Sequence, residues 1–248
     1  MVPIKTPEEL AKMRQGGRIL RQILNYLQAK TQPGVSRKQI NKLAGRLIKS
    51  KNAKPSFLNY QDYPANLCIF TNQEVEHGLP GNKIIQDGDL VTYDLGIYYL
   101  GLHTDASVSF ICGQPSPEKQ AIIKVCQECL QQGIKQARVG RRVGDIGAAI
   151  QKHAEKNGYS VVRQLIGHGV GKEIHEPPNI PNYGQTGTGE KLKKGMCLAI
   201  EPMINQGGHE IKLLKDGWTY VTKDGKLSCH FEHTVAVAKK RAQILTKI

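Results

Sequence analysis

The sequence has few of the features that mark membrane-bound, secreted or base-stacking proteins. Its 248 residues contain no apolar run long enough to cross a membrane, and the first residues lack the apolar segment of a secretory signal. Aromatic residues make up only 6% of the chain and are not interleaved with its basic runs, so base stacking on nucleic acid gets no support. The six cysteines lack disulfide-framework or thiolate-zinc spacing. These absences predict a cytoplasmic protein without membrane segments.

Acidic residues are also scarce, with 21 Asp and Glu against 35 Lys and Arg, which gives a net charge of +14. The basic residues form runs at 49–54, 138–142, 191–194 and 239–241. Any single run is most simply explained as a solvated helix end or loop. The total charge leaves open an attraction to a polyanion such as RNA or the ribosome.

Against this scarcity, several charged side chains lie inside apolar or glycine-bracketed segments. Asp94 follows Leu-Val-Thr-Tyr, and Glu201 follows Met-Cys-Leu-Ala-Ile. Asp105, His168 and Glu232 lie in comparable surroundings. A buried, unpaired carboxylate is costly or becomes neutral, so several carboxylates that converge on one point imply bound cations. Four carboxylates with one imidazole suit manganese, iron(II) or cobalt better than a thiolate zinc site.

Three short segments recur in the same order in the second half of the chain. Residues 34–40, 88–94 and 103–105 correspond to residues 140–146, 195–201 and 230–232. Fixed-order self-similarity indicates a duplicated unit, although chance matching of short apolar patterns is the alternative. We therefore expect a single domain over residues 1–248, built from approximate halves 1–115 and 116–248.

The duplication pairs the carboxylates. Two facing halves would place Asp94 opposite Glu201 and Asp105 opposite Glu232, a four-carboxylate cradle suited to two adjacent metal ions.

Helix signals precede strand signals in both halves. Capping residues and apolar spacing predict helices that begin at Pro7, after Ser36, at Pro117 and near Val143, the last ending near Asn157. Strands are predicted at 67–71, 89–96, 107–112 and 226–237, with a hairpin turn at 223–226. This order predicts an α+β fold, a curved antiparallel sheet with helices on its outer face, and we expect all five candidate residues on strands.

A resemblance to a known family rests on these residues and their neighbours. Asp94 and Asp105 are followed by Gly-His-Gly-Val-Gly at 167–171, Ile-Glu-Pro-Met at 200–203 and Phe-Glu-His-Thr at 231–234. With residues 5–8, 71–80 and 215–218, this set resembles the type I methionine aminopeptidases over essentially the whole chain. The resemblance implies the pita-bread fold with pseudo-two-fold halves and a dinuclear metal site. The short spacing between the last three candidate residues leaves no room for the inserted subdomain of the type II enzymes.

The resemblance also implies a role for each metal-binding residue. Asp94 would bind one ion through both oxygens, Asp105 and Glu232 would bridge, and His168 with Glu201 would complete the second ion. The two divalent ions, which ligand type does not identify among cobalt, manganese, iron(II) and zinc, would activate a water. Glu201 would pass the proton to the leaving amine.

Substrate-binding roles follow in the same way. His77 and His175, each in a loop bounded by glycine or proline, would bind the substrate amide and stabilise the developing oxyanion. The methionine pocket would be lined by Tyr60, Tyr63, Cys68 and Trp218.

Two positions depart from the family pattern. Gln61 stands where histidine is common, and Ile174 stands where an aromatic residue often precedes the second histidine. Either departure could change the pocket for the next residue.

The remaining histidines have weaker signals. His103, His230 and His233 flank the candidate ligands and are equally compatible with orienting roles or plain packing, while His153 and His209 are expected to be structural or exposed.

The expected function is metal-dependent removal of the initiator methionine from nascent polypeptides when the second residue is small. Two alternatives remain: an X-Pro aminopeptidase or prolidase of the same fold, and a non-catalytic pita-bread protein that binds RNA or the ribosome. We further expect a monomer that acts on nascent N-termini and has the potential for transient ribosome association.

Overall fold

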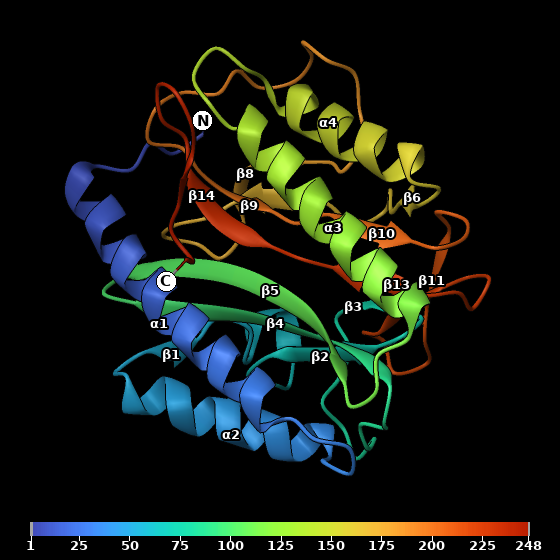
Figure 1. Cartoon of the computed structure of the whole chain (residues 1–248). Helices are drawn as coiled ribbons and strands as arrows, with labels where there is room; N and C mark the ends of the chain where they lie inside the picture. Colours follow the sequence, from blue (N-terminus) through green and yellow to red (C-terminus); the bar gives the residue numbers. More distant parts are fainter. Residues whose placement is uncertain (1, 248) are drawn as a thin grey trace.

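The computed structural model describes residues 2–247, which form four helices packed against antiparallel sheets (Figure 1). The helices are α1 (Pro7–Lys30), α2 (Arg37–Ser50), α3 (Pro117–Gln136) and α4 (Val143–Lys156), with a short 3-10 helix η1 (Tyr60–Asp62). The strands of the first part are β1 (Lys54–Pro55), β2 (Cys68–Thr71), β3 (Glu74–Glu76), β4 (Asp89–Tyr99) and β5 (Leu102–Cys112). Those of the second part are β6 (Ser160–Val161), β7 (Gly167–Gly169), β8 (Glu176–Ile180), β9 (Cys197–Ile200), β10 (Met203–Asn205), β11 (Ile211–Leu213), β12 (Tyr220–Thr222), β13 (Ser228–His230), β14 (His233–Ala236) and β15 (Gln243–Ile244).

The first two helices begin where the sequence predicts. The Thr6 side chain accepts a hydrogen bond from the Glu9 backbone N–H at 3.2 Å, and the Glu9 carboxylate accepts one from the Thr6 N–H at 2.8 Å. Ser36 and Gln39 form the same reciprocal box at the start of α2. These caps satisfy backbone donors that a helix N-terminus otherwise leaves unpaired, so the predicted starts of both helices are confirmed.

Strands β4 and β5 form the longest pairing, with β1 and β2 along β4. The second large sheet has the order β15-β14-β9-β7-β8. Side-chain hydrogen bonds join β5 to two strands of the second part. The Asp105 N–H donates to Thr234 Oγ1 on β14 at 2.9 Å, and Ser109 Oγ donates at 2.6 Å to the carbonyl of His230 on β13, which lies in a separate three-stranded sheet. These bonds hold β5 beside β13 and β14, so segments 120 residues or more apart in sequence share one site.

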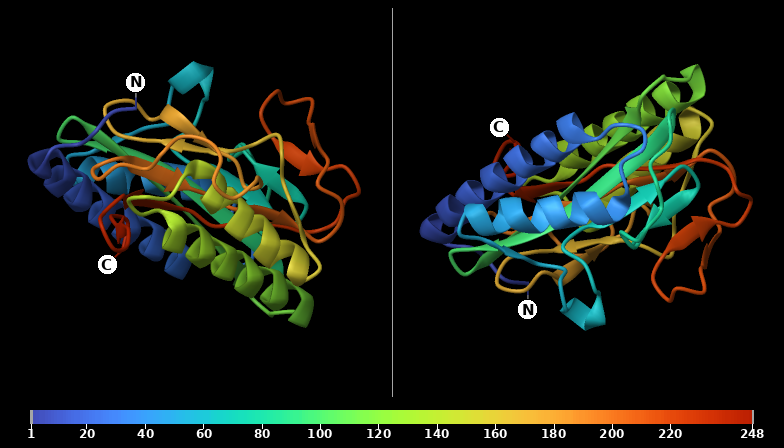
Figure 2. Two further views of the ribbon diagram at one scale, coloured as in Figure 1. Left: turned by 90° about the horizontal axis from the view of Figure 1, so that it is seen from above. Right: turned by 90° about the horizontal axis from the view of Figure 1, so that it is seen from below.

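All four helices lie on one side of the sheets (Figure 2). Helix α1 packs on β4 and β5 through Leu20, Leu24 and Leu27, and α3 packs on α4 and on strands of the second part. The other face of the sheets is therefore left to loops and polar side chains. The α+β class with antiparallel sheets and helices on one face is confirmed, while the division into halves at 115/116 stays a prediction. No helix of residues 2–247 has the length and apolar content that crossing a membrane requires.

The predicted strand at 226–237 is wrong in one respect, because it is interrupted at Phe231 and Glu232. Strand β13 pairs with β10, whereas β14 pairs with β9, so the chain changes sheets between them. The partner strands are themselves separated at Glu201 and Pro202, where proline has no N–H for a ladder bond.

Two smaller expectations are corrected for the same reason. Glu201 and Glu232 lie directly beside strands and not within them, so only three of the five candidate residues are on strands. The turn at 223–226 exists, with Gly225 at φ 75°, but it connects β12 and β13, which belong to different sheets and do not form a hairpin.

Candidate metal centre

A cavity of about 330 Å³ opens between the two parts of the sheet structure. Every residue that the sequence singled out as a candidate ligand, catalytic or pocket residue lines it: Tyr60, Tyr63, Cys68, His77, Asp94, Asp105, His168, His175, Glu201, Trp218 and Glu232. One end of the cavity is acidic and the other is aromatic. Residues that are far apart in sequence have therefore been brought to one place.

The acidic end is built by strands that cross at close range. Asp94 on β4 and Asp105 on β5 lie near each other because β4 and β5 are paired, with Asp105 opposite Gly96. A Cβ at Gly167 would lie 2.5 Å from the Ala199 carbonyl oxygen and 3.2 Å from Glu201 Cγ. Gly167 therefore allows β7 to approach β9, which brings His168 close to Glu201.

The ligand atoms group into two triads. Asp105, His168 and Glu232 each offer an atom within 4.8 Å of the others. Glu201 forms a second group at the same spacing with Glu76 and His230. Asp94 belongs to neither triad but lines the same cavity.

Two members of the second triad were not predicted as site residues. The sequence assigned no role to Glu76, and it placed His230 only among residues that orient or pack. The pattern Glu74-Val75-Glu76 beside His77 was the available signal, since two charged residues enclose a single apolar one.

The carboxylates are buried without protein cations. Asp94 Oδ1, Asp105 Oδ1 and Glu232 Oε1 have no hydrogen-bond partner among residues 2–247. No lysine or arginine of these residues forms an ion pair with the four expected carboxylates; the nearest base is His168, whose Nε2 lies 3.4 Å from Glu201 Oε1. Orphaned buried oxygens facing one another are the donor set that divalent cations fit.

The electrostatics of the cluster support the same assignment. Burial, and then the neighbouring carboxylates, raise the pKa values of Asp105, Glu201 and Glu232 well above their usual range. Burial and Glu76 do the same to the pKa of Asp94. Cations in the cluster would reverse this shift, because positive charge favours the ionised carboxylate.

His168 is prepared to act as a ligand. Its Nδ1 lies 2.8 Å from the Gly169 carbonyl oxygen, which fixes the ring and leaves Nε2 facing the carboxylates. Burial and the nearby His175 lower the pKa of His168 to about 3, so its imidazole is neutral at physiological pH. A neutral imidazole with its other nitrogen hydrogen-bonded is typical of metal-binding histidines.

His77 and His175 lie at the cavity on separate loops. His175 Nδ1 is 2.8 Å from the Tyr60 hydroxyl, and its ring packs edge-on against His168 with centroids 4.3 Å apart. His77 has a left-handed backbone at φ 55°, an uncommon conformation for a residue with a side chain. Burial lowers the pKa of both rings to about 4, so both are neutral hydrogen-bonding groups near pH 7.

Aromatic residues form the other end of the cavity. Tyr63 and Trp218 pack edge to face with centroids 5.1 Å apart. Cys68 pairs with Asp94 across β2 and β4, and burial followed by the Asp94 charge raises the pKa of its thiol well above the usual range. It is therefore an uncharged wall of the pocket, next to the carboxylates.

The two departures from the family pattern have different positions. Gln61 is exposed and lines the cavity, with Nε2 at 3.4 Å from the Tyr60 hydroxyl. Ile174 is buried and packs in the same apolar cluster as Cys68 and Tyr63. Phe57, which the sequence did not indicate, also lines the cavity.

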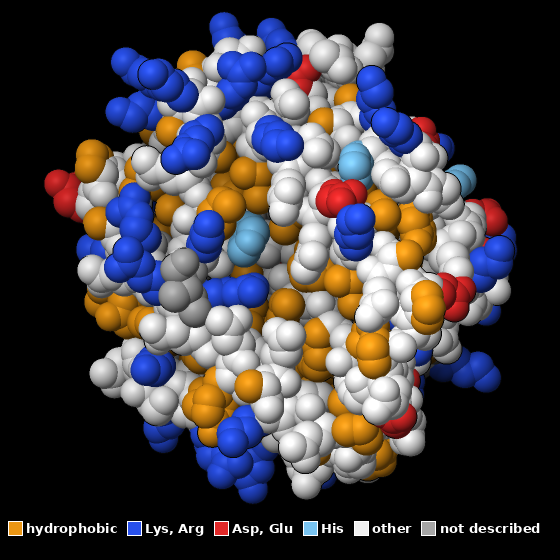
Figure 3. Space-filling model, viewed as in Figure 1, with side chains coloured by type: hydrophobic (Ala, Val, Ile, Leu, Met, Phe, Trp, Pro, Cys, Tyr) orange, Lys and Arg blue, Asp and Glu red, His pale blue; other side chains and the backbone are white. Residues whose placement is uncertain are grey.

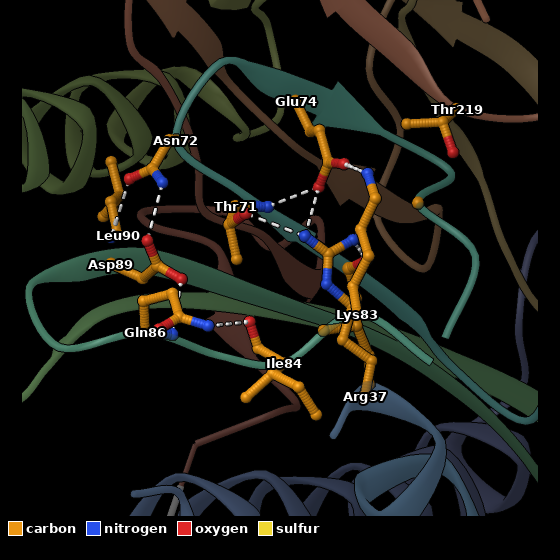
Figure 4. Close-up of polar contacts among 12 residues, drawn as sticks. Arg37, Thr71, Asn72, Glu74, Lys83, Ile84, Gln86, Asp89, Leu90 and Thr219 are labelled. Atoms are coloured by element: carbon orange, nitrogen blue, oxygen red, sulfur yellow. Dashed lines mark hydrogen bonds and ion pairs between the residues drawn. The ribbon is translucent and has the colours of Figure 1, made fainter. Parts of the chain in front are cut away.

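A separate network of hydrogen bonds and ion pairs around Glu74 anchors strand β3, which precedes His77 (Figure 4). Arg37 Nη2 lies 2.7 Å from Glu74 Oε2, and Lys83 Nζ lies 2.7 Å from Glu74 Oε1. Thr71 donates its backbone N–H to the same carboxylate at 2.8 Å. These bonds link α2, β2 and β3, and they fix the position from which Glu76 and His77 enter the site.

Three further histidines have hydrogen-bond partners outside the carboxylate cluster, and the two cysteines of α3 are free thiols. His103 Nδ1 is 2.9 Å from Ser56 Oγ, His233 Nδ1 is 2.8 Å from Thr246 Oγ1, and His153 pairs with Glu128 at 2.8 Å. Cys126 and Cys129 are buried, unbridged thiols on α3.

Comparison with known proteins matches this geometry. The model of metallopeptidase family M24 matches residues 11–239. A methionine aminopeptidase from Clostridium perfringens is 44% identical, with all of both chains covered.

The chain belongs to metallopeptidase family M24, within its methionine aminopeptidases.

The crystal structure of a Thermotoga maritima methionine aminopeptidase superposes with a TM-score of 0.98 at 41% identity, covering 100% of each chain. A prolidase from Pyrococcus furiosus has a TM-score of 0.81 at 24% identity, with 99% of this chain and 65% of that chain covered, which shows a shared fold alone. The pita-bread fold and the family resemblance are thus confirmed. Membership makes this chain a metal-dependent hydrolase, and a requirement for divalent metal comes with the family.

Proposed function

We propose that this chain removes the N-terminal methionine from nascent polypeptides when the second residue is small. The observation that carries the proposal is the single cavity with two unlike ends. An uncharged pocket of Tyr60, Tyr63, Cys68 and Trp218 adjoins a cluster of buried carboxylates that have no lysine or arginine partner among residues 2–247. An apolar side chain in the pocket would place the adjoining peptide bond at the acidic end.

Five residues would hold two divalent cations: Asp94, Asp105, His168, Glu201 and Glu232. In support, Asp94, Asp105 and Glu232 each have a buried oxygen without a hydrogen-bond partner among residues 2–247, and His168 presents a neutral nitrogen to Glu201. Such a cation pair supplies Lewis-acid polarisation of the scissile carbonyl and a water of lowered pKa.

The chain's own groups would do the remaining work. His77 and His175, as neutral imidazoles, would hydrogen-bond the scissile amide and the oxygen on which negative charge develops. Tyr60 holds the His175 ring through Nδ1 and leaves Nε2 available for substrate. Glu201 lies beside His168 and would carry the proton to the leaving amine.

Specificity would follow from the shape and polarity of the pocket. Its wall is aromatic and uncharged, which suits an unbranched thioether and favours sulfur–aromatic contacts. We propose that Gln61, which lines the cavity, influences which second residue is accepted, because it is exposed and its side-chain amide bonds to no described residue but Tyr60.

The test is a metal-reconstitution assay on defined peptides. Metal-free protein would be supplied with manganese, iron(II), cobalt or zinc and assayed on Met-Ala-Ser, Met-Lys-Ser and Xaa-Pro peptides. Release of methionine from Met-Ala-Ser alone is the expected result. A preference for Xaa-Pro peptides would establish the prolidase alternative, and inactivity with every metal would contradict the enzymatic proposal.

A second proposal is that a basic surface of the chain associates with RNA, in particular at the ribosome. Three of the four basic runs are adjacent in the fold, because Arg138 bridges to Ala238 and Arg142 bridges to Lys191. Figure 3 shows Lys and Arg side chains crowded along the upper left of the helix-bearing face. We call this surface the basic edge; its exposed residues are Arg142, Lys191, Lys193, Lys194, Lys239, Lys240 and Arg241.

The basic edge is testable through its salt dependence. Binding that neutralises several phosphates weakens steeply as salt rises. Changing Lys239, Lys240 and Arg241 to glutamine together should weaken association with ribosomes in low salt while leaving cleavage of Met-Ala-Ser unchanged. Changing exposed lysines of the separate run at 49–54 is the matched control. Equal binding by both variants would contradict a specific role for the basic edge.

We propose a monomer as the working unit, acting in the cytosol where nascent N-termini emerge. In support, every residue proposed for the site comes from one chain. Sedimentation of the metal-loaded protein checks this, with a dimer as the contrary result.

A further inference from the structure

Glu76 and His230 form a cluster with Glu201 beside the proposed metal pair, and the proposed function uses neither of them. The three side chains each offer a ligand atom within 4.8 Å of the others, and all three residues are at most 6% exposed. Glu76 lies on β3, Glu201 follows β9, and His230 ends β13. Three elements from distant parts of the sequence therefore converge on one small volume.

The imidazole of His230 has no partner. Neither Nδ1 nor Nε2 is hydrogen-bonded among residues 2–247, although the residue is only 1% exposed. The ring stacks on Phe70 with centroids 6.0 Å apart, and the backbone is held by the bond from Ser109 Oγ to the His230 carbonyl. A fixed, buried ring with two unsatisfied nitrogens is costly unless a further group binds it.

Glu76 has no lysine or arginine partner among residues 2–247. The nearest base is His77, whose Nε2 lies 4.0 Å from Glu76 Oε2. Burial raises the pKa of the Glu76 carboxyl above its usual range. Glu76 also lines the cavity, so a small ion has a route to it from solvent.

The negative charge of the cavity lining also favours a further cation. With Glu76 counted, the cavity is lined by five carboxylates: Glu76, Asp94, Asp105, Glu201 and Glu232. Two divalent cations leave one of those negative charges uncompensated. Either a proton stays on a carboxyl or another cation binds, and the unpartnered imidazole beside Glu76 favours the cation.

We propose that Glu76, Glu201 and His230 form a third binding position for a divalent metal ion, adjacent to the proposed pair. It rests on the proposed function in one respect, because Glu201 is shared with that pair. One imidazole and two carboxylates select borderline or hard ions such as manganese, iron(II), cobalt or zinc. A cation there neutralises Glu76 and satisfies the buried ring of His230.

The experiment counts metal ions and does not depend on activity. Metal-free protein is titrated with Mn(II), and bound metal is measured by calorimetry and by the loss of the free-ion EPR signal. The wild type should bind three equivalents. His230→Gln and Glu76→Gln should each bind two.

Two controls separate this proposal from the proposed function. His153→Gln changes an imidazole paired with Glu128 on the helices and should keep three equivalents. Asp105→Ala should lose ions of the proposed pair.

Each outcome decides one proposal. Two equivalents in the wild type, unchanged in Glu76→Gln and His230→Gln, overturns the third position while leaving the pair intact. Fewer than two in the wild type contradicts the metal pair itself. Circular dichroism confirms that each variant is folded, and the two independent variants guard against a structural artefact in either one.

Discussion

Glu74 and Glu76 are two residues apart on the same short strand, both are buried, and their surroundings are opposite. Glu74 forms ion pairs with Arg37 and Lys83 and accepts a hydrogen bond from a backbone N–H, so its charge is compensated within the protein. Glu76 has no lysine or arginine partner among residues 2–247 and faces other carboxylates. The first stabilises the fold, whereas the second belongs to a cluster that needs cations from solution.

The difference gives a criterion for buried acids in this chain. Where a protein cation is supplied, as also for Glu176 with Lys5, the carboxylate is structural. Where only carboxylates and neutral imidazoles surround it, the carboxylate is available for metal. Removing a charge should therefore have opposite effects on stability in the two environments.

The largest effect is expected for Asp105→Asn. Loss of a proposed metal-binding carboxylate should lower kcat/KM on Met-Ala-Ser about a thousandfold or more, equivalent to about 4 kcal/mol of transition-state stabilisation. In metal-free protein the same change should raise the free energy of unfolding, because it removes one of several mutually repelling buried charges. Urea unfolding of both metal-free proteins measures this. A variant that is fully active, or less stable without metal, would contradict the criterion.

Glu74→Gln should have the opposite effect on stability. It leaves Arg37 buried without its carboxylate, which should lower the free energy of unfolding by about 3 kcal/mol or more. The matched control is Glu210→Gln, whose pair with Lys223 is exposed and should change stability by no more than about 0.5 kcal/mol. Equal effects in the two variants would show that the Glu74 network is not structural.

The same variant has a defined pH dependence. Burial alone would raise the pKa of Glu74, but Arg37, Lys83 and the Thr71 N–H outweigh it and hold the pKa below its usual value. The stability from this group is then fully present above the ordinary glutamate pKa and is lost as pH falls through the lower folded value. The difference in free energy of unfolding between wild type and Glu74→Gln should therefore become smaller as the pH falls. A difference that becomes larger in acid would contradict a lowered pKa of Glu74.

A smaller effect is expected for Lys5→Met. The Lys5 ammonium is paired with the buried Glu176, which also accepts the backbone N–H of Lys172 at 2.7 Å and so closes the loop that carries His175. Loosening this loop should reduce kcat/KM about tenfold. The double variant Lys5→Met, Glu176→Met should recover part of the stability that the single change loses. Lys12→Met, on the exposed side of α1, is the control and should behave as wild type.

The smallest effect is expected for Tyr60→Phe. Without the hydroxyl, His175 Nδ1 loses its 2.8 Å partner, and kcat/KM should fall about fivefold, as for the loss of about 1 kcal/mol. Tyr26→Phe, which changes an exposed ring on α1, should leave kinetics unaltered. Unchanged kinetics in Tyr60→Phe would show that another contact orients the ring.

Much of the candidate site could be predicted because its residues have local signatures. Asp94 and Glu201 follow apolar strands, and His168 lies between glycines that permit close strand approach. The helix starts were equally local, since each capping box spans only four residues. The break at Phe231 and Glu232 could not be predicted in this way, because it depends on which sheet each neighbouring strand joins.

By itself, the sequence determined the family, the α+β class and the set of charged residues that are costly to bury, because residue type and spacing are properties of the chain. The tertiary structure decided which of those charges are compensated. In sequence Glu74 and Glu76 have the same local pattern; only folding brings Arg37 and Lys83 to one of them and an unpartnered His230 to the other. The physical reason is that the cost of a buried charge depends on what lies within a few ångströms in space, and those neighbours come from distant parts of the chain.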